Sequence, residues 1–223
     1  VRREMGSNGP ELLRGADEGK DQSYFLFATT PEQLSYLRFP LGGLEKDATR
    51  DLARKYGLGV SEKPDSQDIC FVPNGSYADV VEKLRPGALD PGEIVDLEGN
   101  VLGQHGGIIG YTVGQRKGLG IAAAEPLYVI RLEPDTHRVV AGPRDALLEK
   151  ALRVSELNWL GTTPLGQEGL SVQVKLRSTQ AMVSAKVFPT ENNAAKVILD
   201  DPQAGIAPGQ ACVFYDGDRV LGG

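Results

Sequence analysis

The spacing of apolar positions changes along the chain, from a helical period near its start to short alternating runs further on. Thr30–Gln33 combines an N-cap threonine, a proline in the first turn and a glutamine three residues after the cap, which predicts a short helix. A second helix is predicted over 46–56, because its apolar residues share one stripe and Gly57 can end it. We therefore expect residues up to about 64 to be helical, with apolar faces that only a further domain could bury.

After Pro86 the period changes from helical to alternating, as in half-buried strands. The stretch 76–84 just before this change is predicted to be one more short helix. Two hairpins are then predicted, over 93–102 and 128–141, because each range holds two apolar runs around a turn-forming loop. Together they indicate a small β-rich central domain.

Six strand-like runs recur at short spacing in the last third of the chain and predict a β-barrel. With turn residues between them, they are 151–159, 171–177, 182–188, 195–199, 210–215 and 219–221. The fold class predicted is α+β and mostly β: short helices first, a small β-rich domain, and a six-stranded type of barrel last. The 28 glycines and 14 prolines are spread along the sequence, as many tight turns require.

The formal net charge is −6 and the pI is about 5.1, which argues against a protein that holds nucleic acid by bulk electrostatics. Any RNA contact must come from local basic patches. The two cysteines have no metal-ligand spacing around them, so neither a zinc site nor a disulfide scaffold is readable. No stretch approaches the roughly 20 apolar residues of a membrane helix, and we expect a cytoplasmic protein with no membrane partner.

Cys70 is the candidate nucleophile, since it stands among polar residues in the segment Asp65–Phe71. A thiol reacts as its thiolate, which needs partial exposure and a nearby positive charge such as that of Lys63. The alternative is a small buried residue, because free cysteine is among the most buried residue types. Cys212 lies in the apolar run 211–214 and is expected to be buried and structural.

Several blocks of the sequence resemble, in the same order, those of the tRNA-specific 2-thiouridylases. They are Lys20–Leu26, Arg38–Gly42, the segment around Cys70, Gly114–Gly120, and Pro208–Gln210 with Val213–Gly217. The resemblance covers almost the whole chain and implies a remnant of the catalytic domain over 1–72, a central β-rich tRNA-binding domain over 73–147 and a β-barrel domain over 148–223. It also implies a C-terminal fragment, since that family begins with a nucleotide-binding domain.

The resemblance implies a chemistry as well. In that family ATP adenylates the oxygen of the wobble uridine in tRNA, and a cysteine persulfide then delivers sulfur to form 2-thiouridine. Cys70 matches the persulfide cysteine, and a cysteine desulfurase or a sulfur-relay protein would supply the sulfur. The family's phosphate loop and its other cysteine match nothing here, and Gly114–Gly120 lacks the spacing of a P-loop. We therefore expect ATP to bind to a domain outside this sequence, no metal, and no activity of the fragment alone.

A contact with tRNA is implied at Lys20, Asp21 and Gln22, which match a contacting triplet of the family. The lysine can neutralise a phosphate, while the acid and the amide can hydrogen-bond sugar or base edges. In isolation the same three residues would be an ordinary solvated turn.

Two further tRNA contacts are implied late in the chain. Arg177 and Ser178 match a contacting pair, although Ser178 stands where some members carry an aromatic residue, which weakens any stacking role. Gln210 matches another contact, and the preceding Pro208 and Gly209 are equally well explained as a turn.

Arg116 and Lys117 are also predicted to contact RNA. This prediction comes from the residues and not from the resemblance, because two cations between glycines can approach a phosphate backbone closely. A charged loop tip is the equally good alternative. His105 is assigned no catalytic role.

Two other function classes remain open on the sequence. A cysteine hydrolase would need a general base for Cys70, and neither His105 nor His137 lies in a recognisable motif. An RNA-binding module without catalysis needs no chemistry at all. The preferred interpretation is an ATP-dependent tRNA sulfurtransferase.

Overall fold

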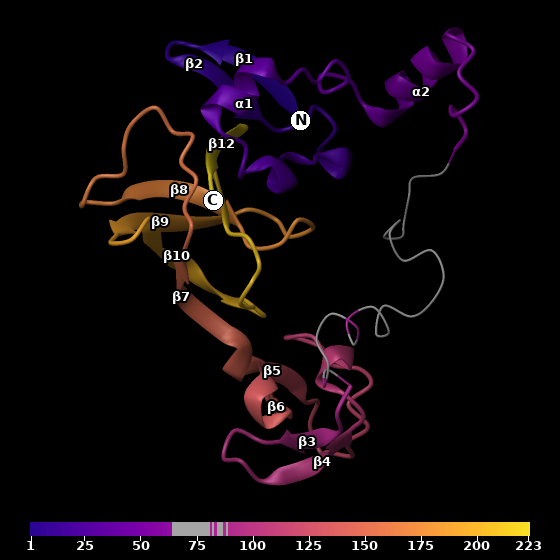
Figure 1. Ribbon diagram of the computed structural model, residues 1–223, viewed down its shortest axis with the longest axis vertical. Helices are drawn as coiled ribbons and strands as arrows, with labels where there is room; N and C mark the ends of the chain where they lie inside the picture. Colours follow the sequence, from indigo (N-terminus) through magenta and orange to yellow (C-terminus); the bar gives the residue numbers. More distant parts are fainter. Residues whose placement is uncertain (64–80, 82, 84–86, 88) are drawn as a thin grey trace. The chain divides into compact units, whose positions relative to one another are not determined.

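The computed structural model describes residues 1–63, 81, 83, 87 and 89–223, which fall into two compact units (Figure 1). The first unit joins the start of the chain to its end, with 1–65, 150–201 and 209–223. The second unit consists of 66–149 and 202–208. The three-part division with boundaries at 72 and 147 stays a prediction.

An eight-stranded sheet forms the frame of the first unit, in the order β1-β2-β12-β11-β8-β9-β10-β7. Its strands are β1 (Arg2–Gly6), β2 (Gly9–Leu13), β7 (Leu148–Val154), β8 (Leu170–Lys175), β9 (Val183–Thr190), β10 (Ala194–Ala204), β11 (Val213–Asp216) and β12 (Arg219–Gly222). Each of the six runs predicted for the last third of the chain overlaps one of the strands β7 to β12. The prediction of a mostly β fold is confirmed.

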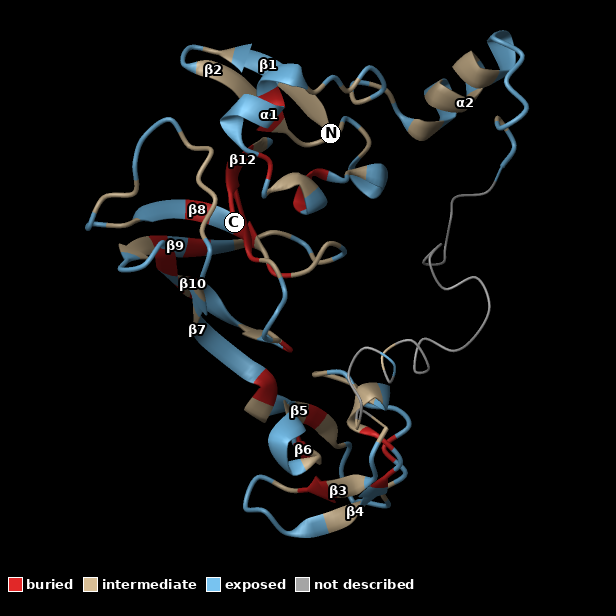
Figure 2. Ribbon diagram, viewed as in Figure 1, coloured by how far each residue is buried: buried red, intermediate tan, exposed pale blue. Residues whose placement is uncertain are grey.

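The alternation of apolar and polar residues fixes which face of each strand is buried. Val172 of β8 lies opposite Ala185 of β9 and both are buried, whereas the next pair, Ser171 and Lys186, is exposed. Because side chains alternate between the two faces of a strand, this register turns one apolar face inward. In β12 every residue after Arg219 is buried (Figure 2).

The chain beyond β7 bends toward β12 and gives the sheet a barrel-like curvature. Trp159 forms an antiparallel bridge with Gly222, and the Leu160 N–H donates to the Leu221 carbonyl at 2.8 Å. A side chain at Gly222 would overlap the Asn158 carbonyl, which explains the glycine. Among the described strands β1 and β7 remain as edges. The predicted six-stranded barrel is therefore an open, barrel-like sheet to which β1 and β2 are added.

The first residues form a hairpin, so the prediction that residues up to about 64 are helical is wrong for 2–13. β1 and β2 pair antiparallel, and Leu13 lies opposite Arg219 of β12. Leu12 is the one buried residue of the two strands, so the hairpin shows almost no alternating apolar pattern. Pairing with β12 from the far end of the chain makes this segment part of the sheet.

Two α-helices form where the sequence predicts them. α1 (Pro31–Tyr36) begins with the predicted capping box: the Gln33 N–H donates to Thr30 Oγ1 at 3.2 Å, and the Thr30 N–H donates to Gln33 Oε1 at 3.0 Å. α2 (Lys46–Lys55) ends before Gly57, whose φ of +66° favours glycine. Within the described part of the chain, no helix has the length and apolarity needed to cross a membrane.

Leu34 ties α1 to the sheet. It is 1% exposed and shares a core with Leu12, Tyr24, Val213, Tyr215 and Val220. The expectation that both helices need a further domain is therefore wrong for α1, whose apolar side is covered by the strands. It stays a prediction for α2, in which no residue is buried.

The second unit contains a four-stranded sheet in the order β4-β3-β6-β5. Its strands are β3 (Gly92–Val95), β4 (Val101–His105), β5 (Tyr128–Glu133) and β6 (Arg138–Gly142). Both predicted hairpins are confirmed, and the parallel pairing of β3 with β6 joins them. The helix predicted over 76–84 lies almost entirely outside the described residues.

Replacing Leu34 by alanine should destabilise the whole first unit. Removing a fully buried leucine side chain costs about 2–5 kcal/mol, because apolar contacts are lost and a cavity remains. The single tryptophan, Trp159, packs near Phe214 in the sheet, so urea unfolding followed by its fluorescence reports on the strands. We expect Leu34→Ala to lower the free energy of unfolding seen by this probe.

Tyr36→Ala is the matched control, because Tyr36 lies on the same helix and is 79% exposed. It should change the free energy of unfolding by no more than about 0.5 kcal/mol. An unchanged Trp159 transition in Leu34→Ala would mean that α1 does not stabilise the sheet.

Candidate nucleic-acid interface

Of the two cysteines, the structure describes only Cys212. Cys70 lies outside the described residues, so its role stays a prediction. Cys212 is 3% exposed, and burial raises the pKa of its thiol to about 12. Since the thiolate is the reactive form, Cys212 is not a nucleophile near neutral pH. The prediction that it is buried and structural is confirmed.

Asp21 faces inward and organises the loop that carries the predicted RNA-contacting triplet. Its side chain is 1% exposed. Oδ1 accepts from the Gly15 N–H at 2.8 Å and from the Ser23 N–H at 3.2 Å, while Oδ2 accepts from Ser23 Oγ at 2.6 Å. The Arg14 guanidinium lies 3.8 Å from Oδ2. These contacts occupy the carboxylate, so Asp21 shapes the loop and does not offer its oxygens to a ligand.

Lys20 and Gln22 flank this buried carboxylate and are both exposed. Lys20 ends the 3-10 turn η1 (Glu18–Lys20), and Gln22 caps the next one, η2 (Ser23–Leu26). Because Asp21 is fixed inward, its two neighbours are held at the surface.

Ser23 and Tyr24 attach the loop to the sheet. Ser23 Oγ lies 3.2 Å from the hydroxyl of Tyr215 in β11, and Tyr24 Oη donates to the Ala211 carbonyl at 2.9 Å. Ala211 directly follows Gln210 in the sequence. The Lys20–Gln22 loop is therefore held beside the segment that contains Gln210.

Arg177 reaches the same place from the end of β8. Its Nε donates to Gln210 Oε1 at 3.4 Å. Burial raises the pKa of Tyr24, the nearby Cys212 adds to this, and the positive charge of Arg177 acts in the opposite direction. Arg177 thus lies within electrostatic reach of Tyr24, and Ser178 follows it, its carbonyl accepting from Lys175 Nζ at 3.3 Å.

Three distant segments therefore meet around Tyr24. We call this the Tyr24 surface and define it by Lys20, Gln22, Arg177, Ser178 and Gln210. Five of the six residues that match family contacts with tRNA lie on these three segments, and the side chain of the sixth, Asp21, is buried.

Phe25 is a feature of the Tyr24 surface that the sequence analysis did not single out. It is 60% exposed, and its ring meets that of Tyr24 edge-on with centroids 5.3 Å apart. An exposed aromatic ring can stack on an unpaired base. The exposure could not be read from the sequence, where Phe25 stands in an apolar run and looks like a core residue.

The remaining predicted residues belong to the second unit. Arg116 and Lys117 are exposed in the loop before β5. His105 is buried and uses both ring nitrogens: Nδ1 accepts from the Gly107 N–H at 3.1 Å, and Nε2 lies 3.0 Å from the His137 carbonyl. These bonds place the ring proton on Nε2 and give His105 a structural position.

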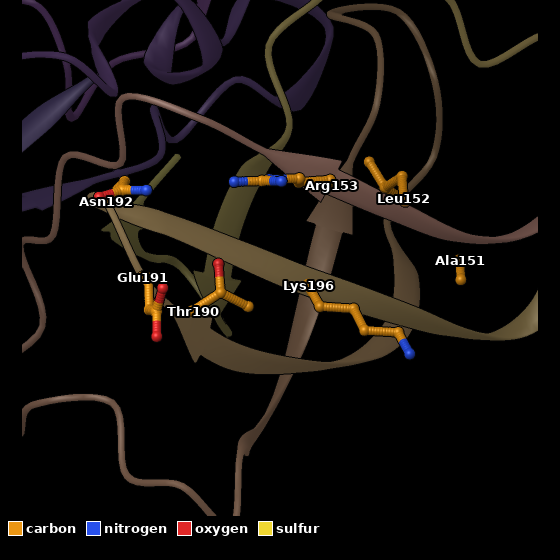
Figure 3. Close-up of a pocket in the computed structure, with 7 residues that line it drawn as sticks. All are labelled: Ala151, Leu152, Arg153, Thr190, Glu191, Asn192 and Lys196. Carbon is orange, nitrogen blue, oxygen red and sulfur yellow. The ribbon is translucent and has the colours of Figure 1, made fainter.

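Figure 3 shows a pocket of about 620 Å³ on the first unit's sheet. The antiparallel register of β8 and β9 puts the β9–β10 turn, which lines this pocket, at the opposite end of these strands from Arg177. β7, the β9–β10 turn and β10 line it with Ala151, Leu152, Arg153, Thr190, Glu191, Asn192 and Lys196. It contains none of the predicted site residues, and its charged groups are of mixed sign.

The prediction that ATP binds to a domain outside this sequence stays a prediction. Within 1–63 the longest helix is α2, which has Glu45 at its N-cap and Asp47 in its first turn, and these carboxylates oppose a triphosphate at that end. In the described part of the chain, no group of three or more His, Cys, Asp or Glu side chains is placed to hold a metal ion.

Three family models match consecutive parts of the chain. The tRNA methyl transferase HUP domain matches residues 1–74, the tRNA methyl transferase PRC-barrel domain 79–143 and the Aminomethyltransferase beta-barrel domain 149–223. The last of these agrees with the barrel-like curvature of the strands from β7 to β12.

Curated relatives match over the whole chain. The tRNA-specific 2-thiouridylase MnmA of Paracoccus denitrificans is 60% identical over 227 residues, and that of Rhodospirillum centenum is 60% identical over 231. The enzyme of Ruegeria pomeroyi is 57% identical over 228 residues. Each alignment includes 100% of this chain, which spans 58%, 58% and 61% of these relatives. From this similarity and the three domain matches, the chain belongs to the tRNA-specific 2-thiouridylase family.

Proposed function

We propose that this chain is the RNA-contacting and sulfur-carrying part of a tRNA sulfurtransferase that forms 2-thiouridine at the wobble position. The observation that carries the proposal is the Tyr24 surface, where the three segments that contain Lys20 and Gln22, Arg177, and Gln210 meet. Identity of about 60% to tRNA-specific 2-thiouridylases over the whole chain supports the choice of substrate.

The Tyr24 surface has the groups that an RNA contact needs. Lys20 and Arg177 supply positive charge for phosphates, and Gln22 supplies an amide that can donate and accept. Gln210 accepts from Arg177 through Oε1, which leaves its Nε2 to donate to a base edge or a ribose. Asp21 acts as a positioning residue, because it fixes the backbone on both sides of Lys20 and Gln22 from below.

Cys70 is proposed to carry the transferred sulfur as a persulfide. After ATP has adenylated the C2 oxygen of the uridine, the terminal sulfur attacks C2, so a C–S bond forms as the C–O bond breaks and the oxygen leaves with AMP. Release of the thiouridine then breaks the S–S bond and requires a second thiol, which is oxidised to a disulfide with Cys70. Cys212 cannot supply that thiol, since it is buried and protonated.

An RNA-binding module without catalysis is the second candidate function, because the Tyr24 surface lies within the described residues whereas Cys70 lies outside them. The two candidates share the Tyr24 surface and differ only at Cys70. A sulfur-transfer assay on a chain of the full length of the relatives, with ATP, a cysteine desulfurase and unmodified tRNA, separates them.

Cys70→Ser should abolish thiolation in that assay and leave the affinity for tRNA nearly unchanged, since serine cannot carry a persulfide. Mass spectrometry after incubation with the desulfurase should find one added sulfur atom on Cys70. Cys212→Ala is the matched control and should retain both the added sulfur and the thiolation.

Thiolation that survives Cys70→Ser would rule out the role of this residue. An unmodified Cys70 in a chain that still binds tRNA would favour the module. Acylation of Cys70 by an ester substrate would instead point to a hydrolase.

Lys20→Gln with Arg177→Gln should weaken tRNA binding roughly tenfold and flatten its salt dependence. Each phosphate contact contributes about 0.7 to 0.9 to the slope of log affinity against log salt, so the double variant should lose about 1.5. Filter binding at several salt concentrations measures both quantities.

The control for charge is Lys55→Gln with Arg54→Gln, because both residues are exposed in the same unit at the end of α2. This double variant removes the same charge away from the Tyr24 surface and should bind nearly as the parent does. Equal losses in the two double variants would show that general charge, and not this surface, holds the RNA.

A further inference from the structure

The loop before β5 in the second unit is fixed to the sheet by its backbone. The Gly114 N–H donates to the Val129 carbonyl at 2.8 Å, and the Val129 N–H donates to the Gln115 carbonyl at 2.9 Å. These two bonds tie the adjacent residues Gly114 and Gln115, at the start of the loop, to Val129 in β5. The residues after Gln115 therefore begin from a defined position.

The side chain of Gln115 closes the loop. Its Oε1 accepts from the Thr112 N–H at 3.0 Å, and its Nε2 donates to the Lys117 carbonyl at 2.9 Å. Both ends of the amide are used within the loop. Gly118 has a φ of +79°, a conformation that residues with a side chain adopt only at a cost. The tip at Arg116 and Lys117 is thus held in one shape.

Leu119 anchors the far side of the tip. It is 7% exposed and belongs to the core formed with Ile94, Val129, Val139 and Ala141. The exposed residues Arg116, Lys117 and Gly118 therefore project between two attachments, one to β5 and one to the core. A loop held in this way loses little conformational entropy when it binds a ligand.

The two cations at the tip form no ion pair with any residue that the structure describes. Among the residues that the structure describes, neither Arg116 nor Lys117 has a carboxylate within 4.0 Å, whereas Arg131 pairs with Glu133 at 2.8 Å in the same unit. Arg138 likewise pairs with a glutamate of β3. The loop therefore presents uncompensated positive charge in a fixed arrangement.

We infer that the 112–120 loop is a second RNA-binding site, in which Arg116 and Lys117 contact backbone phosphates and Gln115 is the positioning residue. The inference rests on the proposed function for the identity of the RNA as tRNA. A free nucleotide fits less well, because the residues after the loop lead into β5 and offer no helix N-terminus for a triphosphate. Because Gly118 has no side chain, a phosphate chain can approach the backbone of the tip closely.

Replacing both cations, Arg116→Gln with Lys117→Gln, tests the site in the 223-residue chain. The affinity for tRNA should fall roughly tenfold, and the slope of log affinity against log salt should shrink by about 1.5, as for the loss of two phosphate contacts. Arg131→Gln with Arg144→Gln removes the same charge from exposed residues of the same unit and should leave affinity and slope nearly unchanged.

Gln115→Ala tests the positioning role. This variant keeps both cations, so the salt slope should stay at the parent value while the affinity falls several-fold, because the loop must be ordered on binding. A residue that served only the stability of the fold would lower the melting temperature and leave the affinity of the folded protein unchanged, which would overturn this role.

Parent-like affinity and slope in Arg116→Gln with Lys117→Gln would overturn the RNA-binding site. So would a double variant that loses binding to polyglutamate but not to tRNA, since that result indicates an acidic protein partner. Neither outcome bears on the proposed function, which is decided by thiolation in Cys70→Ser.

Discussion

The buried carboxylate of Asp21 is the constraint on which the first unit's surface depends. A carboxylate with 1% exposure must have its oxygens hydrogen-bonded, and Gly15 and Ser23 supply these bonds from both sides of the loop. Arg14, 3.8 Å away, also reaches Asp218 in the turn between β11 and β12. One acidic residue thus joins the start of the chain to its last hairpin and holds its two exposed neighbours outward.

This arrangement changes the meaning of the Lys20–Gln22 triplet. Three consecutive polar residues look equivalent in a sequence, and all three can contact RNA in principle. In the fold they divide into two that face solvent and one that faces the interior. The same division recurs in the second unit. There the Gln115 amide forms hydrogen bonds within its own loop, whereas Arg116 and Lys117 are exposed to solvent. In both places a polar residue that satisfies the backbone positions its exposed neighbours.

The sequence predicts those parts of the fold whose signals are local. The capping box at Thr30 and the alternating runs of β7 to β12 are such signals, and the helix and strands form there. The sequence does not predict the hairpin over 2–13, because only Leu12 is buried in it. The strand β12, which joins β2 to the sheet, lies some two hundred residues further along the chain. The sequence does not predict the inward turn of Asp21 or the exposure of Phe25 either, since burial depends on contacts between distant segments. The residues of the candidate surface could be named in advance, but their convergence around Tyr24 could not.

The pairing of β2 with β12 has a consequence for how the protein is made. A ribosome releases the chain from its N-terminal end, and contacts between distant segments form late because a long loop must first be closed. β2 can pair with β1 early, but it cannot pair with β12 until Arg219 has been synthesised. The hydroxyl of Tyr215 and the carbonyl of Ala211, which secure Ser23 and Tyr24, arrive just before it. A prematurely terminated product would therefore lack the contacts that assemble the Tyr24 surface.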